Sequence, residues 1–424
     1  MKTRPGLIVP FVCGLALLVG RAPFEAPRAA ARTPAVVCDW SSQHYDDFYA
    51  PPDLGALAPD RLGELLRVEH LRSYTPEEVA AAADLPSSPY GAEGYRVLFL
   101  SQSPPGVPQA VSGLVIVPAG TAPGDGFPIL VHGHPTTGAA DLCAPSRYAA
   151  NLPELLPWVA RGYLVTAADY AGLGPPGPHP YGIGEVAGLS MLDSARAALR
   201  FCDAARGLEG PAANAIILEG HSQGGHSALF AHELSAAYAP ELNVRGAVVF
   251  APGAELRLMA ERTAEKTWSP ALAPLALAMY GYHEYYAVAG GLAAWLLPPY
   301  AAELPARAEA QCIAGLSAWI GQEPAAVLQP EMLAALLAGD WPALQPWTGY
   351  LDANTPGNYA SEAPVLILQG GLDLLVPLEV SRRLADRLCQ HGTPGMLRLY
   401  LGAGHLNIVN RALPRLEPGH GASH

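Results

Sequence analysis

The sequence predicts an α/β protein in which helices cover a mostly parallel sheet. From residue 94 onward, short and continuous apolar runs of strand length follow one another along the chain. The first of these runs have no helix between them, whereas the later ones alternate with helical patterns. The sheet should therefore begin antiparallel and continue parallel. The alternation then breaks for a segment of about a hundred residues, which should lie outside the sheet.

The elements follow from these patterns in chain order. The expected strands are 95–100, 111–117, 127–131, 163–167, 215–218, 244–250, 365–368 and 396–401. The expected helices between the later strands are 155–160, 190–206, 227–238 and 378–389. Residues 36–93 are rich in proline, aromatic residues and polar turns, and they should form an arm wrapped on the body. One helix is expected in the arm, over residues 75–83, because it opens with a capping box.

The segment that breaks the alternation is rich in alanine, leucine, tryptophan and tyrosine. It lies between two core strands, so it should form a helical cap above the carboxyl edge of the sheet. We expect a signal peptide at 1–33, the first part of the core with its arm at 34–253, the cap at 254–350 and the second part of the core at 351–424. The cap run 271–299 is apolar enough to suggest a membrane span, but a histidine, a glutamate, glycines and prolines interrupt it.

The first residues resemble a secretion signal. Lys2 and Arg4 precede a short apolar run at 6–20, and alanine-rich sequence follows, with cleavage expected near residues 31–35. The run is shorter than the ~20 residues that a spanning helix needs, and an uncleaved anchor is the alternative. Export implies an oxidising compartment. Five cysteines remain after cleavage, and this odd number leaves at least one of them unpaired or paired between chains.

The stretch that carries the chemistry is Gly220-His221-Ser222-Gln223-Gly224, between an apolar strand and a helical run. Strand, G-x-S-x-G and helix together predict a nucleophile elbow, with Ser222 in a strained conformation with positive φ. Gly220 and Gly224 would flank the turn because a Cβ there would collide with the crossing backbone. A chance match in a chain with 44 glycines is the alternative, and the flanking strand and helix argue against it.

A serine nucleophile needs a base, and the base needs a group that fixes its tautomer. Downstream of Ser222, one expected strand runs into a loop that contains Asp373, and the last expected strand runs into a loop that contains His405. Both residues follow strand carboxyl ends, at the edge where Ser222 emerges, in the order serine, acid, histidine that α/β-hydrolase folds use. A helix-capping aspartate and a surface histidine are the alternatives, and the coincidence of both favours a triad.

The oxyanion of the reaction needs two N–H donors. Gln223 should supply one. The other should come from the loop after strand 127–131, from the N–H of Thr137, with Thr136 as the close alternative. The remaining alternative is a turn in which neither threonine has a catalytic role. His132 and His134 in this loop, with Asp141 nearby, could suggest a metal site. No further ligand stands at a suitable spacing, so we expect packing roles and no metal.

Five segments together resemble the secretory lipase family of fungi and bacteria, the lipase A type. They are Asp47-Phe48-Tyr49-Ala50-Pro51-Pro52, Cys143-Ala144-Pro145-Ser146, Asp169-Tyr170-Ala171-Gly172-Leu173-Gly174 with His179-Pro180-Tyr181, Leu192-Asp193-Ser194-Ala195-Arg196, and the serine motif. The resemblance implies a secreted carboxylic ester hydrolase acting on lipids, with Ser222, Asp373 and His405 as its triad. Some members carry an aspartate in the oxyanion loop, where this chain has Thr137. The resemblance also implies a disulfide between Cys143 and Cys312.

We therefore expect a monomeric, cofactor-free serine hydrolase that cleaves lipid esters such as triacylglycerol through an acyl-enzyme. The apolar cap stretches 271–280 and 287–297 would bind a fatty acyl chain over Ser222. The formal net charge of −13 disfavours nucleic acid and anionic membranes and leaves transient contact with a neutral lipid–water interface. A short-chain carboxylesterase or a peptidase on the same core is the alternative. An inactive binding module is the least favoured, because all three triad candidates are present.

Overall fold

A ten-stranded sheet forms the centre of the computed structural model, which describes residues 8–9, 45–104, 106–201 and 212–416. The strands are β1 (Ile8–Val9), β2 (Leu65–Tyr74), β3 (Gly91–Ser103), β4 (Val107–Ala119), β5 (Phe127–Gly133), β6 (Leu164–Ala168), β7 (Ala212–His221), β8 (Val244–Phe250), β9 (Val365–Gly370) and β10 (Gly395–Tyr400). Their order in the sheet is β1-β10-β9-β8-β7-β5-β6-β4-β3-β2.

Strand directions confirm the expected antiparallel start and parallel body. Strands β2, β3, β4 and β6 pair antiparallel in turn, whereas β6, β5, β7, β8, β9 and β10 pair parallel. The central strands of the parallel part, such as β5 and β6, are continuous apolar runs because helices cover both of their faces. Their carboxyl ends lie on one edge of the sheet, and this edge holds the site described below.

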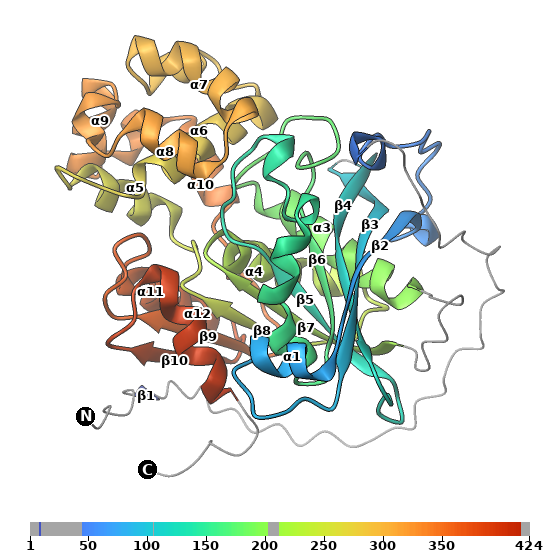
Figure 1. Cartoon of the computed structure of the whole chain (residues 1–424). Coiled ribbons are helices and arrows are strands. Elements are labelled where there is room, and N and C mark those ends of the chain that lie inside the picture. The colour runs from blue at the N-terminus through green and yellow to red at the C-terminus, as the bar shows by residue number, and fades with distance from the viewer. Residues whose placement is uncertain (1–7, 10–44, 105, 202–211, 417–424) are drawn as a thin grey trace.

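Helices cover the sheet on both faces (Figure 1). They are α1 (Pro76–Ala82), α2 (Leu156–Val159), α3 (Gly184–Arg200), α4 (Gln223–Tyr238), α11 (Leu378–Gln390) and α12 (Ile408–Ala412). The crossovers β5–α2–β6 and β6–α3–β7 run in opposite directions across the sheet. Because parallel crossovers are right-handed, α2 and α3 must lie on opposite faces. Helices α3 and α4 pack on each other, and so do α1 and α2.

The segment between β8 and β9 is helical and forms a layer beside the carboxyl edge of the sheet (Figure 1). Its helices are α5 (Leu256–Ala264), α6 (Leu272–Tyr286), α7 (Pro298–Ala310), α8 (Ile313–Ile320), α9 (Pro330–Ala338) and α10 (Trp347–Ala353). Cap side chains such as Leu277 and Leu304 belong to the same apolar cluster as sheet residues such as Ile129 and Leu218, so the cap packs as an extension of the core. Within the described ranges, no helix has the length and apolar character needed to span a bilayer.

The structure differs from the sequence prediction in the arm. Residues Leu65–Tyr74, expected as irregular arm, form the edge strand β2, which pairs with β3. Charged residues such as Arg67, Glu69 and Arg72 interrupt its apolar pattern, as is common in edge strands, and this hid the strand. Helix α3 begins at Gly184, six residues before the predicted start at residue 190, and α10 continues past the expected cap limit of 350 to Ala353. The expected signal peptide lies outside the described residues, apart from β1.

Candidate active site

Ser222 occupies the sharp turn between β7 and α4. Its φ and ψ are 58° and −115°, a strained conformation for a residue with a side chain. A Cβ on Gly220 would lie 2.1 Å from the carbonyl oxygen of Gly224, and one on Gly224 would lie 1.8 Å from that of Gly133. Only glycine fits at either position, because the turn presses α4 against β5 and β7. The predicted positive φ and the steric need for both glycines are therefore present.

Three side chains from three different strand ends meet at this turn. His405 Nε2 lies 2.9 Å from Ser222 Oγ, and His405 Nδ1 lies 2.7 Å from Asp373 Oδ2. The aspartate and histidine side chains are almost fully buried. If the Nδ1–H donates to the carboxylate, Nε2 is left as the acceptor for the serine hydroxyl, which is the tautomer that a general base requires. The structure thus brings the predicted residues Ser222, Asp373 and His405 together.

The loop that holds the acid is braced by hydrogen bonds. Asp373 Oδ1 accepts from the backbone N–H groups of Leu375 and Val376, at 2.9 and 2.8 Å. The amide of Gln369, which is fully buried, donates to the carbonyl oxygen of Val376 at 3.0 Å and accepts from Ser381 Oγ at 2.6 Å. These bonds leave Oδ2 to face His405. Gln369 directly follows the predicted strand 365–368 and lies within β9, but its bracing role could not be inferred from the sequence.

Other histidines surround the triad without joining it. The ring of His221 lies 4.7 Å from the ring of His405, and burial, followed by the neighbouring His405, lowers the pKa of His221 to about 4, so it is neutral at neutral pH. His132 Nδ1 lies 2.5 Å from the buried Glu219. Burial lowers the pKa of His132, but the charge and hydrogen bond of Glu219 outweigh burial and leave that pKa raised. His132 is therefore engaged with Glu219 beside the elbow and does not contact the triad's hydrogen-bonded atoms.

His134, which was weighed as a metal ligand and expected to have a packing role, is engaged with backbone groups. Both ring nitrogens of His134 face carbonyl oxygens, those of Pro135 and Asp169, at 2.7 and 3.2 Å. Burial lowers the pKa of His134 to about 4. In the part of the chain that is described, no group of three or more histidine, cysteine or carboxylate side chains is arranged to hold a metal ion.

The oxyanion loop approaches Ser222 from the end of β5. Gln223 is the first residue of α4, so its backbone N–H has no partner within the helix. In the loop, Thr136 lines the same cavity as Ser222 and Gln223, and its hydroxyl lies 2.7 Å from the hydroxyl of Tyr181, which also lines the cavity. Thr137 does not line this cavity, and its buried hydroxyl has no hydrogen-bond partner among the described residues. The structure therefore places Thr136, and not Thr137, at the cavity, and the choice of the Thr137 N–H as the second donor stays a prediction.

A disulfide and backbone hydrogen bonds tie the oxyanion loop to the cap. Cys143 and Cys312 form a disulfide, with their Cα atoms 5.5 Å apart. Ile313, which follows at the start of α8, donates its N–H to the carbonyl oxygen of Thr137 at 2.8 Å. A β-bridge between Gly138 and Cys312 lies between these links. The cap thus holds this loop in place through α8 and the residue before it.

A cavity of about 420 Å³ opens above Ser222, in the size range of small-molecule sites. The roof comes from the cap, from side chains spaced three or four residues apart so that they share one face of each helix. They are Leu256, Met259, Ala260 and Thr263 of α5 and Pro274, Leu275, Ala278 and Tyr282 of α6. His405, Leu375 and Leu406 complete the wall on the core side. An elongated apolar group would fit between this roof and the serine.

Three of the segments that carry the family resemblance meet in one buried network beneath the oxyanion loop. Asp169 accepts from the hydroxyls of Ser112 and Ser146 and from the N–H of Ser146, the last at 2.9 Å. Ser146 in turn lies 2.9 Å from the hydroxyl of Tyr49. Burial raises the pKa of Asp169 to about 6, although the serine hydrogen bonds oppose this effect. The network joins the arm, the segment after Cys143 and the end of β6.

Comparison with known proteins agrees with the resemblance. The sequence pattern of the secretory lipase family matches residues 148–278. A protein of Mycobacterium tuberculosis (strain CDC 1551 / Oshkosh) described as a probable inactive lipase is 32% identical over 173 residues, 38% of this chain and 37% of that protein. Lipase A of Moesziomyces aphidis is 31% identical over 106 residues, 24% of this chain and 21% of that lipase. The chain therefore spans well under half of the length of these relatives.

Solved structures resemble this chain over much more of its length. The rice cell wall degrading esterase LipA from Xanthomonas oryzae superimposes with a TM-score of 0.69 at 21% identity, covering 83% of this chain and 95% of that one. Candida antarctica lipase A in its closed state gives a TM-score of 0.64 at 17% identity, covering 88% and 86%. The chain has the α/β-hydrolase fold, as the sequence predicted.

Proposed function

Because the chain carries the secretory lipase pattern over residues 148–278, we propose that it is a serine hydrolase that cleaves carboxylic esters of lipids. The observation that carries the proposal is the 2.9 Å separation between Ser222 Oγ and His405 Nε2 under an apolar cavity. The presence of all three triad side chains at hydrogen-bond distances supports an active enzyme, although one relative is described as inactive.

The proposed reaction runs through an acyl-enzyme. His405 takes the proton of Ser222 as Oγ attacks the ester carbonyl carbon, and Asp373 stabilises the imidazolium that forms. The N–H of Gln223 and an N–H of the oxyanion loop hold the tetrahedral oxyanion. His405 then gives its proton to the leaving alcohol. In the second half, His405 deprotonates water, which attacks the acyl carbon and releases the fatty acid and Ser222.

The acyl chain would lie under helices α5 and α6. Their apolar faces bound the cavity, and burial of each methylene there would contribute about 0.8 kcal/mol to binding. This supports medium- or long-chain acyl esters, including triacylglycerol, as substrates. We further propose that the protein works outside the cytoplasm, because the Cys143–Cys312 disulfide suits an oxidising compartment. The charge of −13 disfavours nucleic acid as a partner.

The test replaces the nucleophile and varies the acyl chain. Ser222→Ala should lose ester hydrolysis and labelling by a fluorophosphonate, whereas the matched control Ser235→Ala on α4 should keep both. The intact protein should hydrolyse trioctanoin and triolein as well as tributyrin and p-nitrophenyl esters. Labelling at another serine would refute the nucleophile. Activity confined to acetate and other short esters would favour a short-chain carboxylesterase with the same triad.

A further inference from the structure

We propose that the protein rests on a neutral lipid–water surface through a patch at the mouth of its catalytic cavity. The mouth patch consists of five side chains: Leu372, Leu374, Leu401, Leu406 and Trp268. The inference deepens the proposed function, since it names the surface from which the same site would take its substrate. It places the docking surface mainly on the two core loops that carry the acid and the base, with the cap supplying its border.

The side chains of the mouth patch are unusually exposed for their type. The exposed fractions are 64% for Leu372, 58% for Leu374, 61% for Leu401, 88% for Leu406 and 54% for Trp268. Single exposed leucines are common on protein surfaces, but a gathering of them marks an interaction site. Catalysis does not require these leucines to be exposed, because Asp373 and His405, the catalytic groups on the same two loops, are themselves buried.

Backbone contacts bring together the two core loops that carry the leucines of the patch. Leu372 donates its N–H to the carbonyl oxygen of Ala403 at 2.8 Å, and a Cβ on Gly371 would lie 3.0 Å from Leu401 Cα. The loops at 371–375 and 401–406 therefore run side by side.

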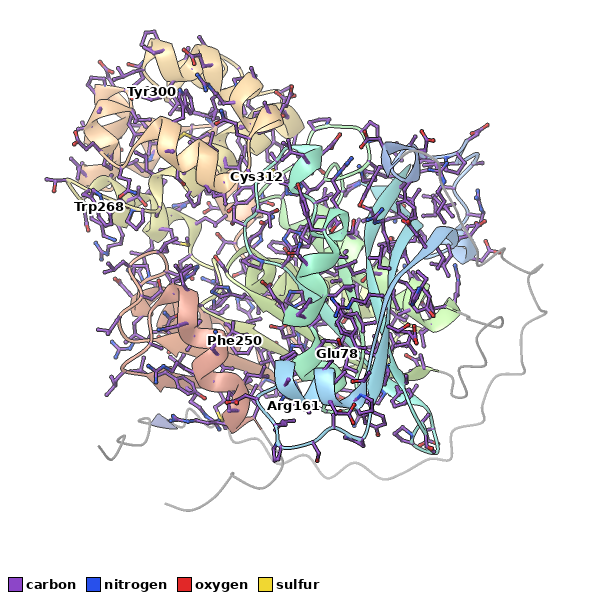
Figure 2. All side chains as sticks on the ribbon, in the orientation of Figure 1. Glu78, Arg161, Phe250, Trp268, Tyr300 and Cys312 are labelled. Carbon is purple, nitrogen blue, oxygen red and sulfur yellow. A yellow bond between two sulfur atoms is a disulfide. The ribbon has the colours of Figure 1, made fainter. Side chains whose placement is uncertain are left out.

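The cap borders these two loops. Lys266 Nζ donates to the carbonyl oxygen of Leu374 at 2.9 Å, which brings the cap segment that carries Trp268 against the core loops. Figure 2 shows Trp268 at the edge of the cap, on the side of the molecule where the segment from β9 to α12 lies.

The place of the patch argues for a lipid surface as its occupant. Leu406 both lines the catalytic cavity and is the most exposed leucine of the patch. Anything that covers the patch also covers the cavity mouth. A protein partner, including a second copy of this chain, would close the entrance, whereas an ester-rich surface would supply substrate directly through it. The charge of −13 favours a neutral surface over an anionic one, and the ammonium of Lys266 is already bound to a carbonyl oxygen.

The test measures binding separately from catalysis. The exported protein with Ser222→Ala is mixed with a triolein emulsion coated with phosphatidylcholine, and the bound fraction is measured by flotation. Leu372→Gln and Leu401→Gln should each weaken partitioning by about five- to twentyfold, from loss of part of a leucine side chain's transfer free energy. Leu337→Gln is the matched control, because Leu337 is 54% exposed on α9 of the cap and outside the patch. It should bind as the parent does.

Activity on a soluble ester separates this inference from the proposed function. With Ser222 intact, Leu372→Gln and Leu401→Gln should hydrolyse p-nitrophenyl butyrate at the parent rate and emulsified triolein more slowly. Equal loss of binding in Leu337→Gln, or no binding of the parent to the emulsion, would overturn the inference while leaving the esterase proposal intact. So would a dimer, seen by sedimentation, that Leu401→Gln converts to monomer. Emulsion binding by a protein inactive on every ester would support the patch and refute the esterase.

Discussion

Breaking the Cys143–Cys312 disulfide should lower both the stability and the catalytic rate. The two cysteines are 169 residues apart in sequence, and closing a loop of that length removes chain entropy from the unfolded state that corresponds to about 5 kcal/mol. The double variant Cys143→Ser/Cys312→Ser should therefore unfold at a clearly lower urea concentration. Its kcat on p-nitrophenyl butyrate should fall about tenfold, because the oxyanion loop loses one of its links to the cap, while KM changes little.

A second variant separates the effect of the cap–loop hydrogen bond on kcat from the effect of the disulfide on stability. Ile313 is the first residue of α8, a position that tolerates proline, and Cys312 before it has the extended backbone that proline requires. Ile313→Pro should keep the helix and the disulfide but remove the N–H that reaches Thr137, and kcat should fall. Ile313→Val, which keeps the N–H, is the control. An unchanged kcat in both the proline and the cysteine variants would refute the idea that the cap positions the oxyanion loop.

Three further changes test the catalytic and buried polar groups. Asp373→Asn should lower kcat by about 10⁴-fold in steady-state assays, because the amide favours the wrong tautomer of His405. A near-normal rate would mean that another acid orients His405. Tyr181→Phe should lower kcat about tenfold with KM unchanged, if its hydroxyl orients that of Thr136 towards the oxyanion; an effect on KM alone would contradict this. Asp169, with its pKa raised to about 6, is more stabilising when protonated, so its contribution is fully present below its unfolded value near pH 4 and is lost as the pH rises through 6. The difference in unfolding free energy between the parent and Asp169→Asn, from urea titrations, should therefore fall by about 2 kcal/mol between pH 4 and pH 7. A flat difference would show that the carboxyl is ionised throughout.

The parallel strands and the positions of the triad candidates could be predicted because each rests on a local signal. The apolar runs before Ser222 and Asp373 mark largely buried strands, and the run before His405 marks the partly buried strand β10. The parallel arrangement carries all three strand ends to one edge. Strand β2 could not be predicted in this way, since an edge strand with one solvated face has no continuous apolar run. Its pairing with β3 is set by the neighbouring strand rather than by its own sequence.

The conformation of the oxyanion loop could not be predicted from local sequence signals. Sequence spacing could not choose between Thr136 and Thr137, because neighbouring residues in a loop point in directions that the backbone fixes. In the structure this backbone is held by Ile313 and Cys312, more than 160 residues further along the chain, and the hydroxyl of Thr136 is held by Tyr181. The residues that form the roof of the cavity could not be predicted either, because the sequence indicates apolar cap helices but not which of their faces lies over Ser222.

The insertion of the cap between β8 and β9 also sets the order in which the site is made during synthesis. The nucleophile leaves the ribosome 183 residues before His405, and the whole cap is made in between. A serine hydroxyl without a base is a weak nucleophile, so the growing chain carries its elbow in an inert form until β10 has paired with β9. A chain that stops short of β10 would keep most of the sheet and the cap but would have no general base. In the proposed mechanism, the position of His405 thus delays hydrolytic competence until β10 is in place.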